Sequence, residues 1–153
     1  AKLLVADVNR DNLKAISNKV SAKVIAPSEI LYADADVIAP CALGNILSSQ
    51  TIPRIKAKVI AGAANNQLST EADGARLTGR EILYAPDYVI NAGGIISVSH
   101  EYFGKSSEDQ VRNDVAKIPQ RLDKIFAESK KTGRPTNELA DELARRIIAA
   151  GKK

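Results

Sequence analysis

The sequence contains few of the residues on which disulfide-linked and metal-binding domains depend. Its 153 residues include one cysteine, one histidine, no methionine and no tryptophan. A single cysteine excludes a disulfide within the chain, so a reducing compartment is expected, most simply the cytoplasm. One cysteine and one histidine do not make the ligand set of a typical zinc site, and no metal is expected.

Long apolar runs and a strongly basic surface are also missing. No run approaches the roughly 20 residues of a membrane span, so no membrane partner is expected. The formal net charge is +4, but residues 1–104 hold 10 basic and 10 acidic residues, and the excess lies in residues 105–153. The charges there alternate at helical spacing, which is typical of a solvated helix face. Because no basic stripe carries interleaved aromatic residues, no nucleic-acid partner is expected.

Short apolar runs alternate with amphipathic stretches through the first part of the chain. Each run is brief and apolar at consecutive positions, a pattern typical of parallel strands that are covered on both faces. Strands that alternate with helices predict an α/β fold with right-handed crossovers. The predicted strands are Leu3–Ala6, Lys23–Ile25, Val37–Ala39, Lys58–Ala61, Ile82–Tyr84 and Tyr88–Ile90.

Helices are predicted between and after these strands. Leu13, Ile16 and Val20 share one helical face. A further helix is expected to include Ile46, Leu47 and Ile52 and to end near Pro53. A short turn is expected at Ser28–Leu31.

The last third of the sequence is predicted to be helical. Gly93–Phe103 has helical spacing, and from Ser107 onward one apolar stripe recurs every three or four residues. Pro119 lies in this stripe and must kink the helix or restart it. Thr136 or Asn137 is predicted to cap a last helix. The stripe consists of Val111, Val115, Ile118, Leu122 and Ile125.

The first predicted strand ends in an acid, Asp7. In dinucleotide-binding folds such an acid holds the adenosine ribose and follows a glycine-rich turn by about 20 residues. No such turn precedes Asp7 in this sequence. Either Asp7 caps the next helix, or the chain is the second part of a longer enzyme, an interpretation with which the missing initiator methionine agrees. Arg10 leaves the choice between NAD and NADP open, because an arginine can accept a 2′-phosphate.

The second interpretation predicts a Rossmann-like, doubly wound parallel sheet that lacks its first strand and is followed by C-terminal helices. In the strand order 3-2-1-4-5-6 the first strand is central. Without it, the strands Leu3–Ala6 and Val37–Ala39 would both expose unpaired edges. Residues 1–104 would be a partial dinucleotide-binding domain, and residues 105–153 a helical segment that packs back on it.

Three further loops follow predicted strands, where open parallel sheets bind their ligands. In the first, the sequence favours Cys41 as a structural or cofactor-wall residue over a nucleophile, since no base for it is evident. The second contains Asn65, Asn66 and Gln67, whose amides suit a carboxamide or a carboxylate, although a simple turn is the alternative.

In the third loop, Asn91 precedes two glycines and a helix N-terminus, which attracts anions or a carboxamide. His100 on that helix is a base or, more simply, a solvated histidine. The sequence shows no Ser/His/Asp set and no paired carboxylates.

These loops carry three runs in order, namely APCALG (39–44), AGAANNQL (61–68) and YAPDYVINAGGI (84–95). Together with Asp7 they resemble the family of leucine, phenylalanine, valine and glutamate dehydrogenases. The resemblance covers nearly the whole chain. It implies the cofactor-binding half of an NAD-dependent enzyme that converts an L-amino acid to its 2-oxo acid and ammonia.

The resemblance also implies roles for single residues. Asp7 and Val8 would lie at the adenosine ribose, and Asn91 would help to fix the nicotinamide. Asn66 would reach the substrate carboxylate or the carboxamide, and Gly94 would open the side-chain pocket. The remaining cofactor-binding residues would be Cys41, Ala42 and Leu43 at the adenosine and ribose, and Ala64 and Asn65 at the nicotinamide ribose.

The implied substrate is leucine-like. Glutamate-specific members place a serine where this chain has Val98, and with Ile95 this valine forms an apolar wall that cannot bond a distal carboxylate. Phenylalanine, valine or glutamate as substrate is the alternative within the family, and a non-catalytic nucleotide-binding module is the alternative outside it. The family's catalytic lysine and aspartate are expected upstream of Ala1, so no catalytic residue is assigned here and the isolated chain is expected to be inactive. A homo-oligomer is expected because the family forms closed oligomers.

Overall fold

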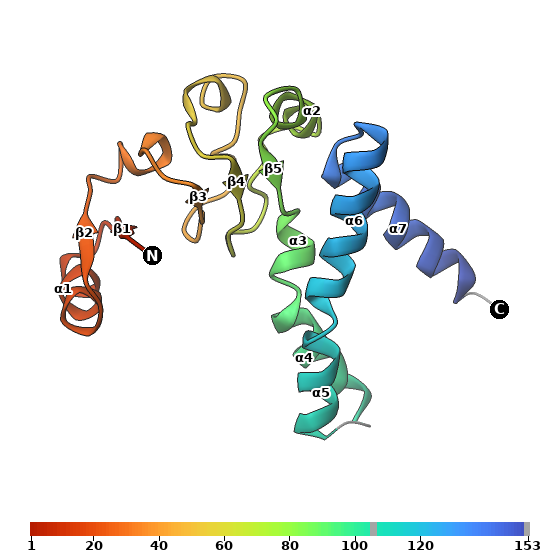
Figure 1. Ribbon diagram of the computed structural model, residues 1–153. Coiled ribbons are helices and arrows are strands. Elements are labelled where there is room, and N and C mark those ends of the chain that lie inside the picture. Colours follow the sequence, from red (N-terminus) through yellow and green to blue (C-terminus); the bar gives the residue numbers. More distant parts are fainter. Residues whose placement is uncertain (105–106, 152–153) are drawn as a thin grey trace.

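The computed structural model describes residues 1–104 and 107–151. In these ranges short parallel strands alternate with helices, which confirms the α/β class (Figure 1). Strand β1 (Leu3–Val5) pairs with β2 (Ala22–Val24) in one sheet. A second sheet contains β3 (Val37–Ile38), β4 (Val59–Ile60) and β5 (Leu83–Tyr84), in that order. None of the described helices is both long and apolar enough to cross a membrane.

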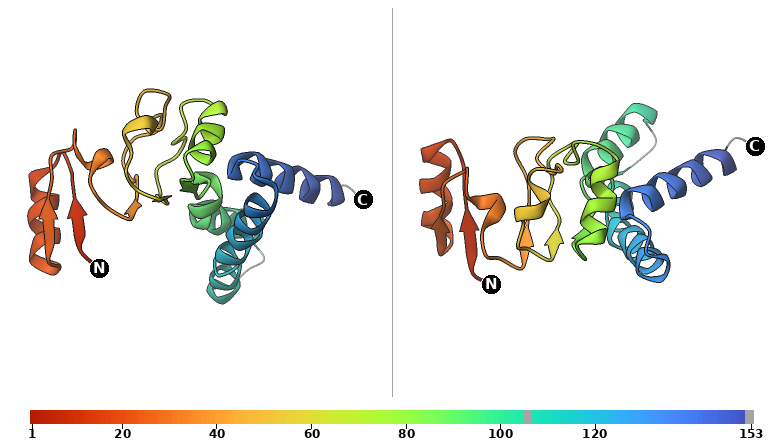
Figure 2. Two further views of the ribbon diagram at one scale, coloured as in Figure 1. Left: turned by 45° about the horizontal axis from the view of Figure 1, so that its top comes forward. Right: turned by 90° about the horizontal axis from the view of Figure 1, so that it is seen from above.

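The two sheets are separate, and β1 is the strand of the first sheet that lies nearer to β3 (Figures 1 and 2). Within the described ranges β1 pairs only with β2, and β3 pairs only with β4. The expectation of two unpaired strand edges is therefore confirmed. A cavity of about 510 Å³ lies beside β1 and is lined by residues that include Leu4, Tyr32 and Arg54. The Arg54 guanidinium carbon lies 3.8 Å from the centre of the Tyr32 ring.

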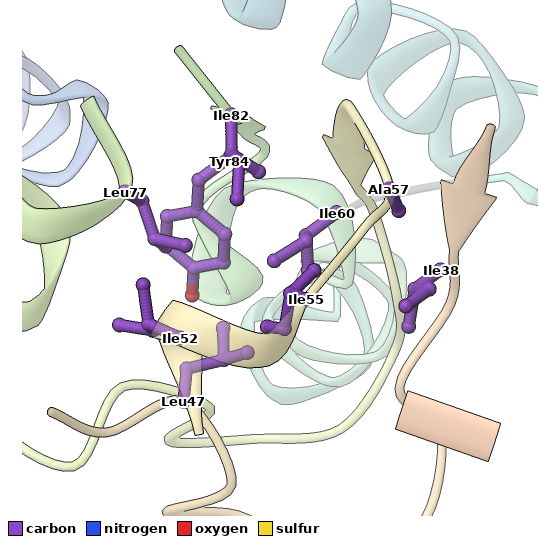
Figure 3. Close-up of a cluster of buried hydrophobic side chains, with 9 residues drawn as sticks. All are labelled: Ile38, Leu47, Ile52, Ile55, Ala57, Ile60, Leu77, Ile82 and Tyr84. Carbon is purple, nitrogen blue, oxygen red and sulfur yellow. The ribbon is translucent and has the colours of Figure 1, made fainter. Parts of the chain in front are cut away.

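The main core lies against the second sheet (Figure 3). Ile38 and Ile60 contribute from β3 and β4, and the Tyr84 ring contributes from β5 beside Leu77. The short 3-10 helix η2 (Ile52–Arg54) and the helix α2 (Ala72–Gly79) close this core. Burial of the apolar side chains therefore places the ends of β3, β4 and β5 side by side. The cluster comprises Ile38, Leu47, Ile52, Ile55, Ala57, Ile60, Leu77, Ile82 and Tyr84.

Two smaller apolar clusters hold the C-terminal helices against the second sheet. Ala85 packs with Ile118 and Leu122, and Val89 also contacts the cluster around Ile125. The chain therefore turns back, so that residues after 107 cover residues 85–92. The helices of this region are α3 (Asp87–Ile90), α4 (Gly93–Phe103), α5 (Glu108–Val115), α6 (Ile118–Thr132) and α7 (Thr136–Ala150).

Local signals explain where several of these helices begin. Asn9 caps α1 (Arg10–Lys19) by accepting a hydrogen bond from the Asp11 N–H. Ser107 and Gln110 form a reciprocal capping box at α5. Pro119 lies in the first turn of α6, where its missing N–H costs nothing, so the apolar stripe is restarted rather than kinked. The expected turn near Ser28–Leu31 contains the 3-10 helix η1 (Ile30–Tyr32).

The prediction of a strand at Tyr88–Ile90 is wrong, because these residues belong to the helix α3. The N–H groups of Val89 and Ile90 both donate to the Pro86 carbonyl. Val89 and Ile90 pack against the cluster of α6. A short apolar run is ambiguous between a buried strand and a buried helical turn, and packing on α6 decides it here.

The helix predicted to include Ile46, Leu47 and Ile52 is wrong at Ile46 and Leu47, and Ile52 begins a short 3-10 helix. Leu47 forms an isolated parallel bridge with Leu68, and only Ile52–Arg54 is helical. The Thr51 hydroxyl donates to the Ile46 carbonyl at 2.6 Å and accepts from the Ser48 N–H at 2.9 Å. Side chains of this kind offer the backbone an alternative to helical hydrogen bonds.

The expected cap by Thr136 or Asn137 is not formed, since Pro135 occupies the cap position of α7. Instead, the buried Thr136 hydroxyl donates to the carbonyl oxygen of Tyr84 at 2.7 Å. This bond joins α7 to the end of β5.

We predict that Thr136→Val lowers the free energy of unfolding by about 1–3 kcal/mol, because it leaves the buried Tyr84 carbonyl without its partner. Thr132→Val is the matched control. Its exposed hydroxyl donates to the Glu128 carbonyl within α6 and accepts a long bond of 3.4 Å from the Arg134 N–H. Water can replace both bonds, so the change is expected to stay within about 0.5 kcal/mol. Urea denaturation of the purified protein measures both values, and equal effects would contradict the assigned role of Thr136.

Candidate functional site

The loops after β3 and β4 are in direct backbone contact. The Ala64 N–H donates to the Pro40 carbonyl at 2.9 Å. A Cβ atom on Gly62 would overlap the backbone of Pro40, and one on Gly44 would lie 2.6 Å from the carbonyl oxygen of Asn65. Both glycines are therefore required by the close approach of the two loops.

Two asparagines join these loops further along. The Asn45 N–H donates to the Asn66 carbonyl at 2.6 Å. Asn45 has a φ of 58° and Asn66 a φ of 53°, a left-handed conformation that asparagine tolerates better than most residues. The Asn-Asn sequence thus forms a turn, as one interpretation of it predicted, and the turn presents both exposed side chains on the surface.

The buried side chain of Gln67 stabilises the same turn through hydrogen bonds. Its side chain is fully buried, and its amide nitrogen donates to the carbonyls of Gly62 at 2.8 Å and Ala64 at 2.9 Å. The third amide of the run is therefore structural.

The segment after β5 completes the arrangement. The Asn91 amide nitrogen donates to the side-chain oxygen of Asn65 at 2.6 Å and to the Ala63 carbonyl at 3.2 Å. The Asp87 carboxylate accepts from the Asn66 N–H at 2.5 Å. Three of the four loops that were predicted to follow strands at one end of a parallel sheet therefore meet through hydrogen bonds. The last of the three follows the helix α3 rather than a strand.

Most of the predicted ligand-binding side chains are accessible on this surface. Leu43 is 76% exposed, and on α4 Ile95 and Val98 are 67% and 57% exposed. A Cβ atom on Gly94 would meet nothing within 4 Å, so the N-terminus of α4 is open. Cys41, Ala42, Asn65 and Asn66 are also exposed, whereas Ala64 is buried.

Asp7 lies at the end of β1, in the other sheet. Its carboxylate accepts from the Asn9 N–H and from the Asn12 amide, both at 2.8 Å, and these bonds lower the pKa of Asp7 below its usual value. Asp7 is therefore ionised at neutral pH and organises the turn before α1. Its neighbour Val8 is 90% exposed. No hydrogen bond within residues 1–104 and 107–151 links this turn to the other three loops.

His100, the single histidine of the chain, lies in a small ionic cluster. His100 Nε2 lies 2.8 Å from the carboxylate of Asp114, which also accepts from Lys117 at 2.6 Å. His100 thus joins α4 to the region of α5 and α6. In the described part of the chain, no group of three or more His, Cys, Asp or Glu residues could hold a metal ion.

Comparison with known proteins shows the family. Residues 1–150 match the model of the Glutamate/Leucine/Phenylalanine/Valine dehydrogenase family. The chain belongs to this family. A leucine dehydrogenase of Geobacillus stearothermophilus is 41% identical over 153 residues, which are the whole of this chain and 41% of that protein. The chain therefore spans about two fifths of the length of this relative.

Solved structures of the family agree in fold. The crystal structure of L-tryptophan dehydrogenase from Nostoc punctiforme superposes with a TM-score of 0.92 at 43% identity, over 99% of this chain and 45% of that one. A hetero-hexameric glutamate dehydrogenase from Thermus thermophilus superposes with a TM-score of 0.61 at 16% identity, over 92% of this chain and 44% of that one. The second likeness concerns the fold alone.

Asp87 and Tyr84 lie within the run YAPDYVINAGGI, and no role was predicted for either of them. Asp87 directly follows a proline between a strand and a helix, and it is 8% exposed. A charged residue in an otherwise apolar run at a strand end is the signal that could have identified it, because buried carboxylates require partners.

We predict that Gly62→Ala lowers the free energy of unfolding by about 1–3 kcal/mol, because the added methyl group overlaps the Pro40 backbone, which cannot yield as a side chain would. Gly79→Ala is the control. Nothing lies within 4 Å of a Cβ atom there, and alanine favours the end of α2, so no loss is expected. Thermal or urea unfolding measures both, and a neutral Gly62→Ala would contradict the close contact of the two loops.

Proposed function

We propose that this chain is the cofactor-binding part of an NAD-dependent amino-acid dehydrogenase that acts reversibly on a leucine-like L-amino acid. The observation that carries this proposal is the hydrogen bond between the Asn65 and Asn91 side-chain amides, with the exposed Asn66 next to it and the open N-terminus of α4 beside it. Family membership supplies the reaction class, which is oxidative deamination to a 2-oxo acid and ammonia.

The residues present fit a nicotinamide dinucleotide. An ionised carboxylate at Asp7 can accept both hydroxyls of a ribose and would repel a 2′-phosphate, which favours NAD over NADP. Exposed apolar groups at Val8 and Leu43 suit the flat face of an adenine. Neutral amides at Asn65 and Asn91 suit a ribose and a carboxamide without placing net charge near the reacting carbon.

In this proposal the two sheets form one doubly wound, Rossmann-like sheet in the whole protein. One further parallel strand would lie between β1 and β3, where both edges are unpaired. This chain covers 41% of the Geobacillus stearothermophilus leucine dehydrogenase, so a protein of similar length would have enough further sequence to supply such a strand. Residues 1–104 would belong to that dinucleotide-binding domain, and residues 105–153 would be the helical segment that packs on it.

The residues of this chain would bind and orient rather than exchange protons. NAD, when bound, supplies the hydride acceptor. Asp7, with the adenosine-facing residues Cys41, Ala42 and Leu43, would fix one end of the cofactor. Ala64, Asn65 and Asn91 would fix the other end, and Asn66 would hold the substrate carboxylate. The catalytic lysine and aspartate are proposed to lie outside these 153 residues.

The substrate proposal rests on α4. Ile95 and Val98 are exposed on this helix and carry no hydrogen-bonding group, while Gly94 leaves room beside them. A wall of this kind accepts an aliphatic side chain and rejects a carboxylate, which would be desolvated without a partner. An aromatic substrate is the second candidate, because the L-tryptophan dehydrogenase superposes with a TM-score of 0.92.

A homo-oligomer is proposed as well, because α7 leaves a pair of large apolar side chains exposed. Ile147 and Ile148 are both about 60% exposed on α7 and are candidates for such a contact. The cytoplasm is proposed as the compartment, and no nucleic-acid or membrane partner is proposed.

We predict that the full-length protein, with NAD, uses leucine with a kcat/KM at least about a hundredfold above that for glutamate, because an unpaired buried carboxylate costs several kcal/mol. Initial rates of NADH formation with leucine, valine, phenylalanine, tryptophan and glutamate measure this preference. A preference for glutamate would contradict the assignment of Ile95 and Val98.

We predict that Asp7→Ser in the full-length protein raises the dissociation constant for NAD by about tenfold or more, because hydrogen bonds to a charged acceptor are lost. The dissociation constant for NADP should change much less, so that the preference for NAD over NADP becomes smaller. Asp11→Ser is the control, since Asp11 is an exposed acid in the first turn of α1. Equal behaviour of the two variants in calorimetric titrations would remove Asp7 from the ribose site.

A further inference from the structure

Asp87 is a buried carboxylate whose hydrogen-bonding partners are neutral donors. It is 8% exposed at the start of α3. One carboxylate oxygen accepts from the Asn66 N–H at 2.5 Å, and the other accepts from the Tyr84 hydroxyl at 3.0 Å. The ion pairs of residues 1–104 and 107–151 involve other carboxylates. Burying a charge in this way is costly, so the carboxylate must hold something specific.

Asp87 binds the main-chain N–H of Asn66, a residue in the left-handed conformation. Asn66 has a φ of 53°, which points its N–H toward Asp87 while its carbonyl accepts from the Asn45 N–H at 2.6 Å. Asn66 is therefore clamped from two loops through its main chain, while its side chain remains exposed. The adjacent Asn65 is fixed by Asn91 at 2.6 Å.

Tyr84 holds the carboxylate in its turn. Its hydroxyl donates to the Asp87 side chain and accepts from the Asp87 N–H at 3.3 Å. Burial and the negative charge of Asp87 raise the pKa of Tyr84, so this hydroxyl stays protonated and remains a donor at neutral pH. The Tyr84 carbonyl is itself bonded by Thr136.

We propose that Asp87 is a positioning residue for the dehydrogenase reaction, which sets the Asn65–Asn66 turn through the Asn66 N–H and is itself oriented by Tyr84. This inference rests on the proposed function, because the turn is assigned there to the nicotinamide ribose and the substrate. Asp87 touches neither the substrate nor the cofactor. Its effect passes through the backbone of a residue 21 positions away in the sequence.

The test compares Asp87→Ala, Asp87→Asn and Tyr84→Phe in the full-length protein, with Leu139→Ala as control. Leu139 is buried between α6 and α7, so its truncation lowers stability without touching the turn. Asp87→Ala should lower kcat and raise the dissociation constant for NAD by about tenfold to a hundredfold, as expected when a positioning contact is lost. Leu139→Ala should change neither by more than about threefold once measured well below its unfolding midpoint.

Rescue by the conservative variant separates positioning from general stability. In Asp87→Asn the amide oxygen can still accept from the Asn66 N–H, and the amide nitrogen can donate to the Tyr84 hydroxyl. This variant should recover most of the lost activity, and Tyr84→Phe should fall between the two Asp87 variants. The proposal is overturned if Asp87→Ala changes kcat and the dissociation constant for NAD no more than Leu139→Ala does. It is also overturned if Asp87→Asn is no more active than Asp87→Ala.

Hydrogen exchange at the Asn66 amide distinguishes failure of this inference from failure of the proposed function. Asp87→Ala should speed that exchange in the protein without cofactor, because the amide loses its acceptor. Unchanged exchange in an active enzyme overturns the clamp and leaves the dehydrogenase assignment intact. A wild-type protein that neither binds NAD nor oxidises amino acids overturns both.

Discussion

The turn at Asn65–Gln67 is the point on which the rest of the site depends, because three chain segments satisfy their hydrogen bonds there. The Asn66 carbonyl accepts from the loop after β3, and the Asn66 N–H donates to the segment after β5. The buried Gln67 side chain stabilises the turn, because its amide nitrogen donates to the carbonyls of Gly62 and Ala64. Buried main-chain groups must be paired, so no one of the three loops can move without leaving a donor or an acceptor unsatisfied. The exposed asparagine side chains are thus carried on a rigid base.

Much of this arrangement could be predicted from the sequence, because parallel strands that are covered on both faces have a strong local pattern. Five of the six predicted strands are present, and the loops after β3 and β4 meet as the topology of such sheets requires. Tyr88–Ile90 has the same apolar pattern and is helical because α6 lies against it, which only the tertiary structure decides. The role of Asp87 was not predicted, for a related reason. Its partner Asn66 lies 21 residues away, and no local pattern shows which donor a carboxylate will meet.

The last helix takes part in the site although it lies far from it in the sequence. Thr136 bonds the Tyr84 carbonyl at 2.7 Å, and the Tyr88 hydroxyl donates to the Asp141 carboxylate at 2.5 Å. Burial and its hydrogen bond to Asp141 raise the pKa of Tyr88, so this contact persists at neutral pH. The residues on both sides of Asp87 are therefore anchored to α7. Hydrogen bonds thus join α7 to the segment that carries Asp87 at two points.

The free edges of β1 and β3 have a consequence for handling the protein in the laboratory. In the described part of the chain each of these strands has one partner, and each keeps a row of main-chain donors and acceptors open. Val37 is 53% exposed and Leu3 is 46% exposed beside these edges. Open edges with apolar neighbours recruit strands from other molecules. A 153-residue polypeptide expressed by itself is therefore a candidate for inclusion bodies or strand-exchanged assemblies.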